Sequence, residues 1–402
     1  MDSVARMRFT SSPPTSGSLL LTGGTGLLGS YLIRDLLLDG CGLAVIVRRE
    51  RKTSAAARIE AIVRFWEDLL GKRLPRPTVL EGDLHAPLCG LDPAAVRWVA
   101  DHCTGLLHNA ASLTFRGPDR EQEPWRSNVG GTINVLAVAK AAGIRHFHHV
   151  STAYVCGLRT GTVREDDLDV GQEFGNDYER SKVEAERLVR DADHLETVTV
   201  LRPSIIVGDS RTGFTSTYHG FYVILRLCHT LIPHVPWGAI SREALVQCLG
   251  TRDEDTKNLV PVDWVSAAMA HIVQTPQARG RTFHLTNPRP VPNETITLTA
   301  EEAVRARLSE PTVPQERQDG TWLAQNILGQ MDVYKTYLRD DPVFDRTNTE
   351  SLTAHLPCPE LDAAALRTLA DYAIDAEFGR QPAFPIPDDV ARPRSVVSTA
   401  PA

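Results

Sequence analysis

The sequence lacks several features that would place it outside the class of ordinary globular proteins. No apolar run has the length needed to cross a bilayer, and no secretory signal is present, so neither a membrane span nor export is expected. The net charge is −7, which gives no support to binding of nucleic acid or of an anionic membrane. His219, His229 and His234 do not have metal-ligand spacing, so no metal is expected.

Cysteine pairs of the C-x-x-C type are also missing. The seven cysteines are widely spaced and odd in number, and reduced thiols explain them most simply. We therefore expect a cytoplasmic protein. A hydrophobic fraction of 42% and a charged fraction of 23% are ordinary for a folded chain.

At 402 residues the chain exceeds one typical domain, so a large domain with a smaller addition is expected. Apolar strand patterns alternate with helical patterns, which predicts an α/β fold built on a doubly wound parallel sheet of the Rossmann type. The expected strands are 19–22, 43–47, 78–81, 105–109, 146–151, 198–207 and 282–286. The expected helices are 27–39, 54–70, 92–101, 125–142, 178–192 and 262–274.

The stretch 19–40 is the most informative part of this alternation. A short apolar run precedes Gly23, Gly26 and Gly29, and an amphipathic helix follows them. Glycines are needed where a chain turns sharply and where its backbone approaches a pyrophosphate, and a helix N-terminus offers free N–H donors. The turn therefore predicts nucleotide binding, with Thr25, Leu27 and Leu28 in the same cradle. A tight strand–helix connection without a ligand is the alternative.

The second expected strand ends about twenty residues after the glycine turn, where an NAD site usually has Asp or Glu. Arg48 and Arg49 stand there instead, and Arg58 follows on the next expected helix. Guanidinium groups hold a 2′-phosphate through charge-assisted hydrogen bonds, which favours NADPH. A solvated face of arginines is the alternative.

The residues that follow two further strands are suited to binding an adenosine. Asp83 follows the third strand and could accept from the adenine amino group, while Leu84 could pack on the ring. The fourth strand ends in His108 and then Asn109, Ala110 and Ala111, small residues that leave room for adenosine and ribose.

The chemistry is expected at Tyr178 and Lys182, whose spacing of four puts both side chains on one face of a helix. A neighbouring ammonium should lower the pKa of the phenol from its ordinary value of about 10, and the lysine could also hold a nicotinamide ribose. A solvent-facing pair is the alternative. The preceding strand ends in Ser151 and Thr152, and a hydroxyl there can donate to a carbonyl oxygen that gains negative charge. We prefer Thr152 for this role, since Ser151 could serve only in capping or packing.

These segments together resemble a known family. The resemblance rests on the ordered set TGGTGLLG, GDL, HNAA, NVGGT, VSTAYV, YERSK, LRPSIIVGDSRTG, NLVPVDWV and FHLTNP. The set is similar to the extended short-chain dehydrogenase/reductases and, within them, to the thioester-reductase branch. That branch includes the terminal reductase domains of nonribosomal peptide synthetases and carboxylic acid reductases, and the fatty acyl-CoA reductases. The resemblance covers residues 18–290.

The resemblance implies roles for individual residues. Thr152 would be the hydroxyl member of a catalytic triad with Tyr178 and Lys182. Arg48 and Arg58 match the paired arginines for NADPH. The resemblance also matches Asp83 and Leu84 to adenine contacts, and it brings Pro203 and Ser204 towards the nicotinamide.

The implied activity is NADPH-dependent reduction of an acyl thioester to an aldehyde, with an alcohol after a second cycle. The acyl group would be held on phosphopantetheine, in a carrier protein or in coenzyme A. Two other functions stay open at this point. One is a sugar-nucleotide epimerase, dehydratase or ketone reductase of the same superfamily, and the other is a non-catalytic nucleotide-sensing or scaffold protein.

The expected division of the chain has four parts. A disordered tail at 1–17 precedes an NADP-binding Rossmann domain at 18–290, a helical substrate-binding region at 291–380 and a second disordered tail at 381–402. Within the Rossmann domain, the apolar and partly aromatic segment 212–250 fits a substrate lid and a buried core helix equally well.

Overall fold

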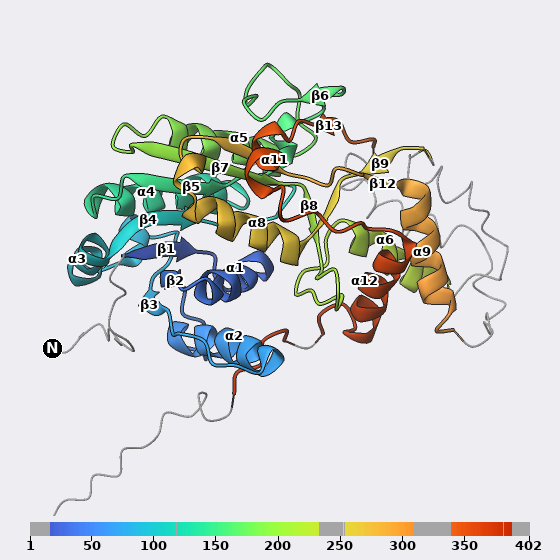
Figure 1. Ribbon diagram of the computed structural model, residues 1–402, viewed down its shortest axis with the longest axis horizontal. Helices are drawn as coiled ribbons and strands as arrows, with labels where there is room; N and C mark the ends of the chain where they lie inside the picture. The colour runs from blue at the N-terminus through green and yellow to red at the C-terminus, as the bar shows by residue number, and fades with distance from the viewer. Residues whose placement is uncertain are drawn as a thin grey trace, which may run out of the picture.

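A computed structural model describes residues 17–117, 119–232, 252, 254–308, 339–380 and 382–387. A central sheet lies between helices, and a smaller group of helices stands at one end of the molecule, on the right in Figure 1. Within the described ranges, every helix falls short of the length and apolarity that a membrane span demands.

The central sheet has seven strands, and all its neighbouring pairs are parallel. Across the sheet the order is β11 (Thr282–Leu285), β7 (Thr197–Pro203), β5 (His146–Val150), β4 (Cys103–His108), β1 (Ser18–Thr22), β2 (Gly42–Val47) and β3 (Thr78–Glu81). The predicted fold class, a doubly wound parallel sheet, is confirmed. The strand order reverses between β1 and β4, and ligands of such sheets bind outside the carboxyl ends at this point.

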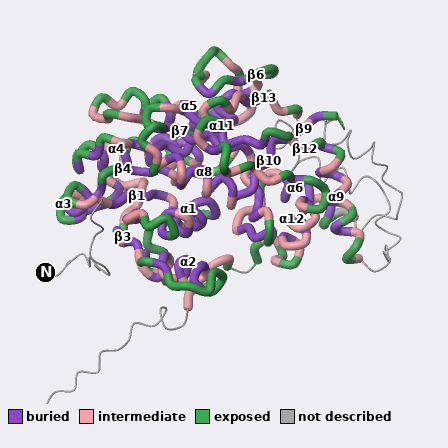
Figure 2. Tube along the Cα trace, viewed as in Figure 1, coloured by how far each residue is buried: buried purple, intermediate pink, exposed green. Residues whose placement is uncertain are grey.

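Two apolar cores cover the two faces of the sheet. One holds α1 (Leu27–Leu38), α2 (Ala55–Leu70) and α8 (Val262–Gln274), and the other holds α3 (Pro93–His102), α4 (Thr132–Ala141) and the end of α5 (Asp177–Arg190). Leu19 and Leu21 belong to the first core and Leu20 to the second, because successive strand side chains point to opposite faces. Figure 2 shows the strands buried and the outer helix surfaces exposed.

The expected strand 198–207 is wrong as a single element. It divides into β7 and β8 (Ile205–Val207), and β8 pairs with β10 (Leu259–Pro261) instead of continuing in the central sheet. The division has a local cause at Ser204. Its N–H still donates to the carbonyl oxygen of Leu285 in β11, whereas the N–H of Ile205 donates to that of Asn258. The chain therefore leaves the sheet directly at the cavity described below.

A third core fills the smaller group of helices. It is formed by α6 (Phe221–Leu231), α9 (Asn293–Arg305) and α12 (Ala363–Asp375), with β9 (Thr256–Lys257) and β12 (Val291–Pro292) paired antiparallel beside them. The described helical part of segment 212–250 is thus a core helix, with Phe221 and Leu225 fully buried in it. Residues 233–250 of that segment, which include His234, lie outside the described residues.

The C-terminal part of the chain also returns to the central sheet. β13 (Val343–Phe344) pairs in parallel with β6 (Thr162–Val163), and α11 (Thr347–Thr353) packs against β11 and α8. Beyond residue 380, inside the range expected to be a tail, the ring of Phe384 packs against Phe65 and Phe214. Short helical turns complete the description: η1 (Pro87–Gly90), the π-helical η2 (Arg126–Gly131), η3 (Ala153–Cys156) and η5 (Pro276–Ala278).

Candidate active site

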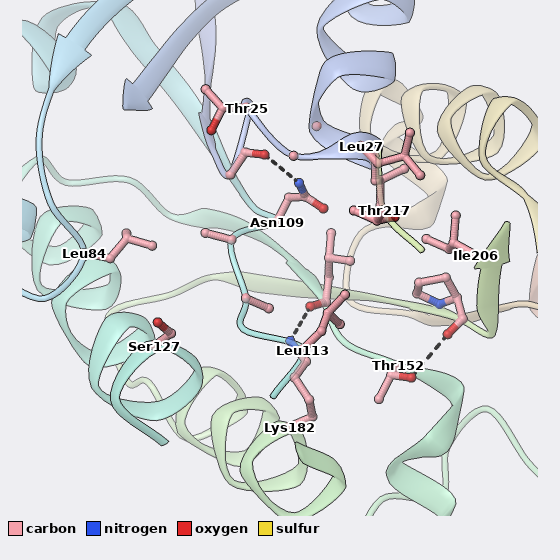
Figure 3. A pocket seen from close by; sticks show the side chains of 18 of the residues that line it. Thr25, Leu27, Leu84, Asn109, Leu113, Ser127, Thr152, Lys182, Ile206 and Thr217 are labelled. Atoms are coloured by element: carbon pink, nitrogen blue, oxygen red, sulfur yellow. Dashed lines mark hydrogen bonds between the residues drawn. The ribbon is translucent and has the colours of Figure 1, made fainter. Parts of the chain in front are cut away.

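A cavity of about 530 Å³ opens at the carboxyl ends of the parallel strands. With the exception of Arg49, the site residues expected from the sequence line it: Gly23, Thr25, Gly26, Leu27, Leu28, Gly29, Arg48, Arg58, Asp83, Leu84, Asn109, Ala110, Ala111, Thr152, Tyr178, Lys182, Pro203 and Ser204. Figure 3 shows residues from the glycine turn, from the end of β4 and from α5 around one space. Residues up to 181 positions apart in the sequence therefore meet in one place.

The glycine turn between β1 and α1 forms one wall of this cavity. Gly23 has a φ of +72°, and a Cβ there would lie 2.6 Å from the backbone nitrogen of Ala110. A Cβ on Gly29 would overlap the carbonyl oxygen of Gly23, so both positions need glycine for the fold itself. Gly26 is different, because a Cβ there would meet only the carbonyl oxygen of Gly23, at 3.7 Å.

Gly26 is also the N-cap of α1, and no side chain caps this helix. Its first backbone N–H groups therefore stand at the cavity wall with the positive end of the helix dipole behind them. Free donors beside a glycine with open space around it fit a pyrophosphate. The chain's own residues thus suit the phosphates of a dinucleotide.

Two arginines follow β2 at the same end of the cavity. Arg58, on α2, donates to the backbone carbonyl oxygen of Arg48 at 2.8 Å and pairs with the carboxylate of Glu50 at 2.9 Å. The bond to Arg48 holds the Arg58 guanidinium against the loop that ends β2. Arg48 itself is exposed. A guanidinium nitrogen of Arg49 lies 3.9 Å from a carboxylate oxygen of Glu81, and Arg49 is not part of the cavity lining.

The residues that follow β3 are held by hydrogen bonds from neighbouring elements. Asn134 of α4 donates to the carbonyl oxygen of Leu84 at 2.7 Å, and the N–H of His85 donates to the Asp83 carboxylate at 3.1 Å. On the opposite side, the Asn109 side chain donates to the carbonyl oxygen of Gly23 at 3.2 Å and ties the end of β4 to the glycine turn (Figure 3).

Tyr178 lies in the first turn of α5, whose N-cap Asn176 accepts from the N–H of Glu179. The phenol is buried, and the edge of the Phe115 ring packs against it. Burial raises the pKa of Tyr178 to about 12, although a hydrogen bond with Thr152 acts in the opposite direction. The expected lowering of this pKa by Lys182 is therefore wrong, because desolvation of the phenolate dominates. The phenol is neutral across the physiological range.

Lys182 lies one helical turn after Tyr178 and is 2% exposed. Its Nζ donates to the backbone carbonyl oxygen of Val150, at the end of β5, over 2.8 Å (Figure 3). Burial lowers the pKa of Lys182 to about 8, and the negative charge of Glu186 partly offsets that effect. The ammonium thus contacts the strand end that leads to Thr152.

Thr152 is the N-cap of η3 and accepts from the N–H of Tyr154 at 3.3 Å. Its hydroxyl donates to the carbonyl oxygen of Pro203 at 3.4 Å (Figure 3). Ser151 also lines the cavity, but its buried Oγ has no hydrogen-bond partner among the described residues. Capping was one role considered for Ser151. In the structure, Thr152 makes the side-chain cap at this position.

Several other lining residues were not expected from the sequence. They are Ile46, Val47, Gly82, His85, Leu113, Phe115, Ser127, Val150, Tyr154, Ile205, Ile206, Thr217, His219 and Gly220. Leu113 and Phe115 could have been found from their place just after the fourth strand. Thr217, His219 and Gly220 belong to the first part of segment 212–250, but nothing in its composition separates them from residues that pack in the third core. Tyr154 lies two residues after Thr152.

Comparison with known proteins places these residues in context. The family described as "Male sterility protein" matches residues 21–269. A non-canonical nonribosomal peptide synthetase, hkm10 of Aspergillus hancockii, is 25% identical over 90% of this chain and 37% of its own length. The aldehyde reductase lnaA of Aspergillus flavus is 27% identical over 89% of this chain and 36% of its own length. The chain thus spans little more than a third of either relative.

A solved structure covers nearly the whole chain. The terminal R domain from the myxalamid PKS-NRPS biosynthetic pathway superposes with a TM-score of 0.70 at 26% identity, over 91% of this chain and 93% of that domain. The resemblance noted in the sequence motifs is confirmed by these matches, and the chain belongs to the male sterility protein family.

Proposed function

We propose that the chain is an NADPH-dependent reductase that converts an acyl thioester on phosphopantetheine to an aldehyde. The observation that carries the proposal is the common cavity. An uncapped helix N-terminus, two arginines and the set Thr152, Tyr178 and Lys182 all line it. A binding module would need only the first two of these features, whereas carbonyl reduction needs the third as well.

The substrate class in this proposal draws on the relatives. Their names include nonribosomal peptide synthetase and aldehyde reductase, and the similar solved structure is a terminal R domain of a PKS-NRPS pathway. Such synthetases hold their intermediates as thioesters, as the resemblance in the sequence implies. We therefore propose a carrier-bound or coenzyme A-bound acyl thioester, with the aldehyde reduced onward to an alcohol if a second cycle follows.

The choice of NADPH over NADH rests on the charges that follow β2. Arg48 and Arg58 line the cavity there, and Glu50, the acidic residue of that loop, is paired with Arg58 outside the lining. Guanidinium groups suit a 2′-phosphate, which an unpaired carboxylate would repel. NADPH, when bound, supplies the hydride.

The side chains supply the proton and the polarisation of the carbonyl. Tyr178 is a neutral phenol and can donate its proton to the carbonyl oxygen of the substrate as that oxygen becomes negative. Thr152 can turn its hydroxyl hydrogen away from the carbonyl oxygen of Pro203, to which it donates over a long 3.4 Å, and donate a second hydrogen bond to the same substrate oxygen. Lys182, held at Val150, places a positive charge on the Tyr178 face of α5 and favours the phenolate left after proton transfer. The resulting hemithioacetal breaks its C–S bond and releases an aldehyde and a free thiol.

A substrate panel tests the proposal. Consumption of NADPH is followed with octanoyl-CoA and octanoyl-pantetheine, and the products are identified by mass. Conversion of UDP-glucose and GDP-mannose is followed in parallel by chromatography, because epimerisation or dehydration consumes no net cofactor. We expect octanal or octanol from the thioesters and no turnover of nucleotide sugars. Turnover of nucleotide sugars alone would replace the proposal with the sugar-nucleotide alternative. Nucleotide binding without any turnover would support a sensing protein.

A further inference from the structure

The carboxylate of Asp341 does not line the cavity, but hydrogen bonds connect it to two residues that do. Tyr154 is bonded to it directly, and Ser204 is connected to it through Asn258. Its Oδ2 accepts from the hydroxyl of Tyr154 and from the backbone N–H of Asn258, each at 2.7 Å. Its Oδ1 pairs with Lys257 at 3.1 Å, and both charged side chains are 3% exposed. Asp341 and Tyr154 are 187 positions apart in the sequence. A buried ion pair with further hydrogen bonds holds a defined geometry.

Asn258 connects Asp341 to Ser204, at the β7–β8 junction. Its side-chain oxygen accepts from the Ser204 hydroxyl at 2.7 Å and from the N–H of Asn287 at 2.7 Å. Ser204 is the residue at which the chain leaves the central sheet, and it lines the cavity beside Pro203. Asn258 thus joins the β7–β8 junction to the carboxylate of Asp341.

The hydrogen bonds close a ring around Thr152. Thr152 donates to the carbonyl oxygen of Pro203, which precedes Ser204, and it accepts from the N–H of Tyr154. Tyr154 and Ser204 lead by the two routes just described to Asp341. The rings of Tyr154 and Phe344 also make a T-shaped contact, with the centroids 6.1 Å apart, and Phe344 packs with Ala153 and Cys156 of η3.

We propose that Asp341 is a positioning residue that fixes the Thr152 hydroxyl through Tyr154 and Ser204. Asp341 touches neither the cavity nor the residues that would react. It acts because a hydroxyl donor is effective only within a narrow range of positions, and the C-terminal segment defines that position here. This role rests on the proposed function, in which Thr152 donates to the substrate carbonyl oxygen.

Tyr154→Phe is the sharpest test, because it keeps the ring in the cavity wall and removes only the hydroxyl that faces Asp341. The matched control is Tyr31→Phe. Tyr31 is also buried and donates to the buried carboxylate of Asp209 at 3.1 Å, but it does not line the cavity. Both variants lose one tyrosine–carboxylate hydrogen bond, so a general loss of stability affects them alike.

Two readouts separate positioning from stability. With NADPH and octanoyl-CoA or octanal, we expect Tyr154→Phe to lower kcat by about tenfold or more while KM for NADPH changes by less than about twofold. Hydrogen–deuterium exchange of peptides that cover residues 152–158 should become faster in Tyr154→Phe. Tyr31→Phe should leave kcat and the exchange of this segment unchanged. Asp341→Asn should follow the pattern of Tyr154→Phe, and if that variant fails to fold, Tyr154→Phe decides.

Equal losses of kcat in both tyrosine variants, or unchanged exchange at 152–158 in Tyr154→Phe, would overturn the positioning role. If the wild-type protein turns over neither octanoyl-CoA nor octanal, the proposed function fails, and the exchange comparison still decides whether Asp341 orders the Thr152 segment.

Discussion

The ammonium of Lys182 donates to the backbone carbonyl oxygen of Val150 over 2.8 Å. This bond joins α5, which carries Tyr178, to the strand end that carries Thr152. The buried ammonium of Lys182 therefore fixes the two elements that carry the candidate proton donors, Tyr178 and Thr152, relative to each other. The position and the charge state of Lys182 affect both.

The rate of reduction should fall as the pH rises above about 8. Burial lowers the pKa of Lys182 to about 8, so its positive charge is present below that pH and is lost above it. Tyr178, with a pKa raised to about 12, stays protonated over the same range. We expect a descending limb near pH 8 in the profile of kcat/KM. A profile that is flat or rising from pH 7 to 10 would contradict this role of Lys182.

Replacement of Tyr178 by Phe should abolish reduction and leave cofactor binding nearly intact. Loss of a general acid lowers kcat by about 10²–10⁴-fold. The aromatic ring remains packed against Phe115. Steady-state kinetics measure the first effect, and fluorescence titration with NADPH measures the second. Retention of wild-type kcat would exclude Tyr178 as the acid.

Arg58→Ala should raise KM for NADPH by about 10–100-fold, since a hydrogen bond between charged groups contributes about 1.5–3 kcal/mol. KM for NADH should change little, because NADH has no 2′-phosphate. The matched control is Arg64→Ala on the same helix, where the side chain pairs with Glu60 at 2.8 Å. Equal effects of Arg58→Ala on both cofactors would refute the assignment of this arginine to the 2′-phosphate.

Gly26→Ala should fold but bind NADPH weakly. The new Cβ would meet only one protein atom within 4 Å, at 3.7 Å, so the unfolding free energy should change by less than about 1 kcal/mol. The methyl group would instead occupy space at the free N–H groups of α1. Thermal unfolding and NADPH titration measure the two effects, with Gly130→Ala as the control, since a Cβ there has open space. Unchanged NADPH affinity in Gly26→Ala would argue against a pyrophosphate at this turn.

Glu186→Gln should destabilise the fold by about 3–5 kcal/mol, because it leaves the buried Arg202 without a counter-charge. Burial alone would raise the pKa of Glu186, but the charges and hydrogen bonds of Arg202 and Arg190 outweigh it and lower the pKa to about 2. The wild type should therefore lose this contribution as the pH falls from about 4.5 towards 2.

Denaturant unfolding at several pH values measures both effects of Glu186. The control is Glu184→Gln on the same helix, which breaks a solvent-exposed pair with Arg120 and should change the stability far less. A Glu186→Gln protein as stable as the control would show that the buried pair contributes little.

The sequence by itself determined the features that depend on local order. Alternating strands and helices predicted the parallel sheet, and a spacing of four placed Tyr178 and Lys182 on one helix face. The glycine turn could be predicted because Gly23 and Gly29 meet steric demands that arise within a single strand–turn–helix unit and its neighbouring strand.

Tertiary structure alone decided the features that depend on distant contacts and on exclusion of water. The pKa of Tyr178 rises because other parts of the chain cover the phenol, which helix spacing does not reveal. The strand expected at 198–207 divides at Ser204 because Asn258 offers it a hydrogen-bond partner outside the sheet. Asp341 reaches Tyr154 only after the C-terminal segment folds back over η3. Local patterns predict which face a side chain occupies, whereas desolvation and long-range pairing exist only once the chain is packed.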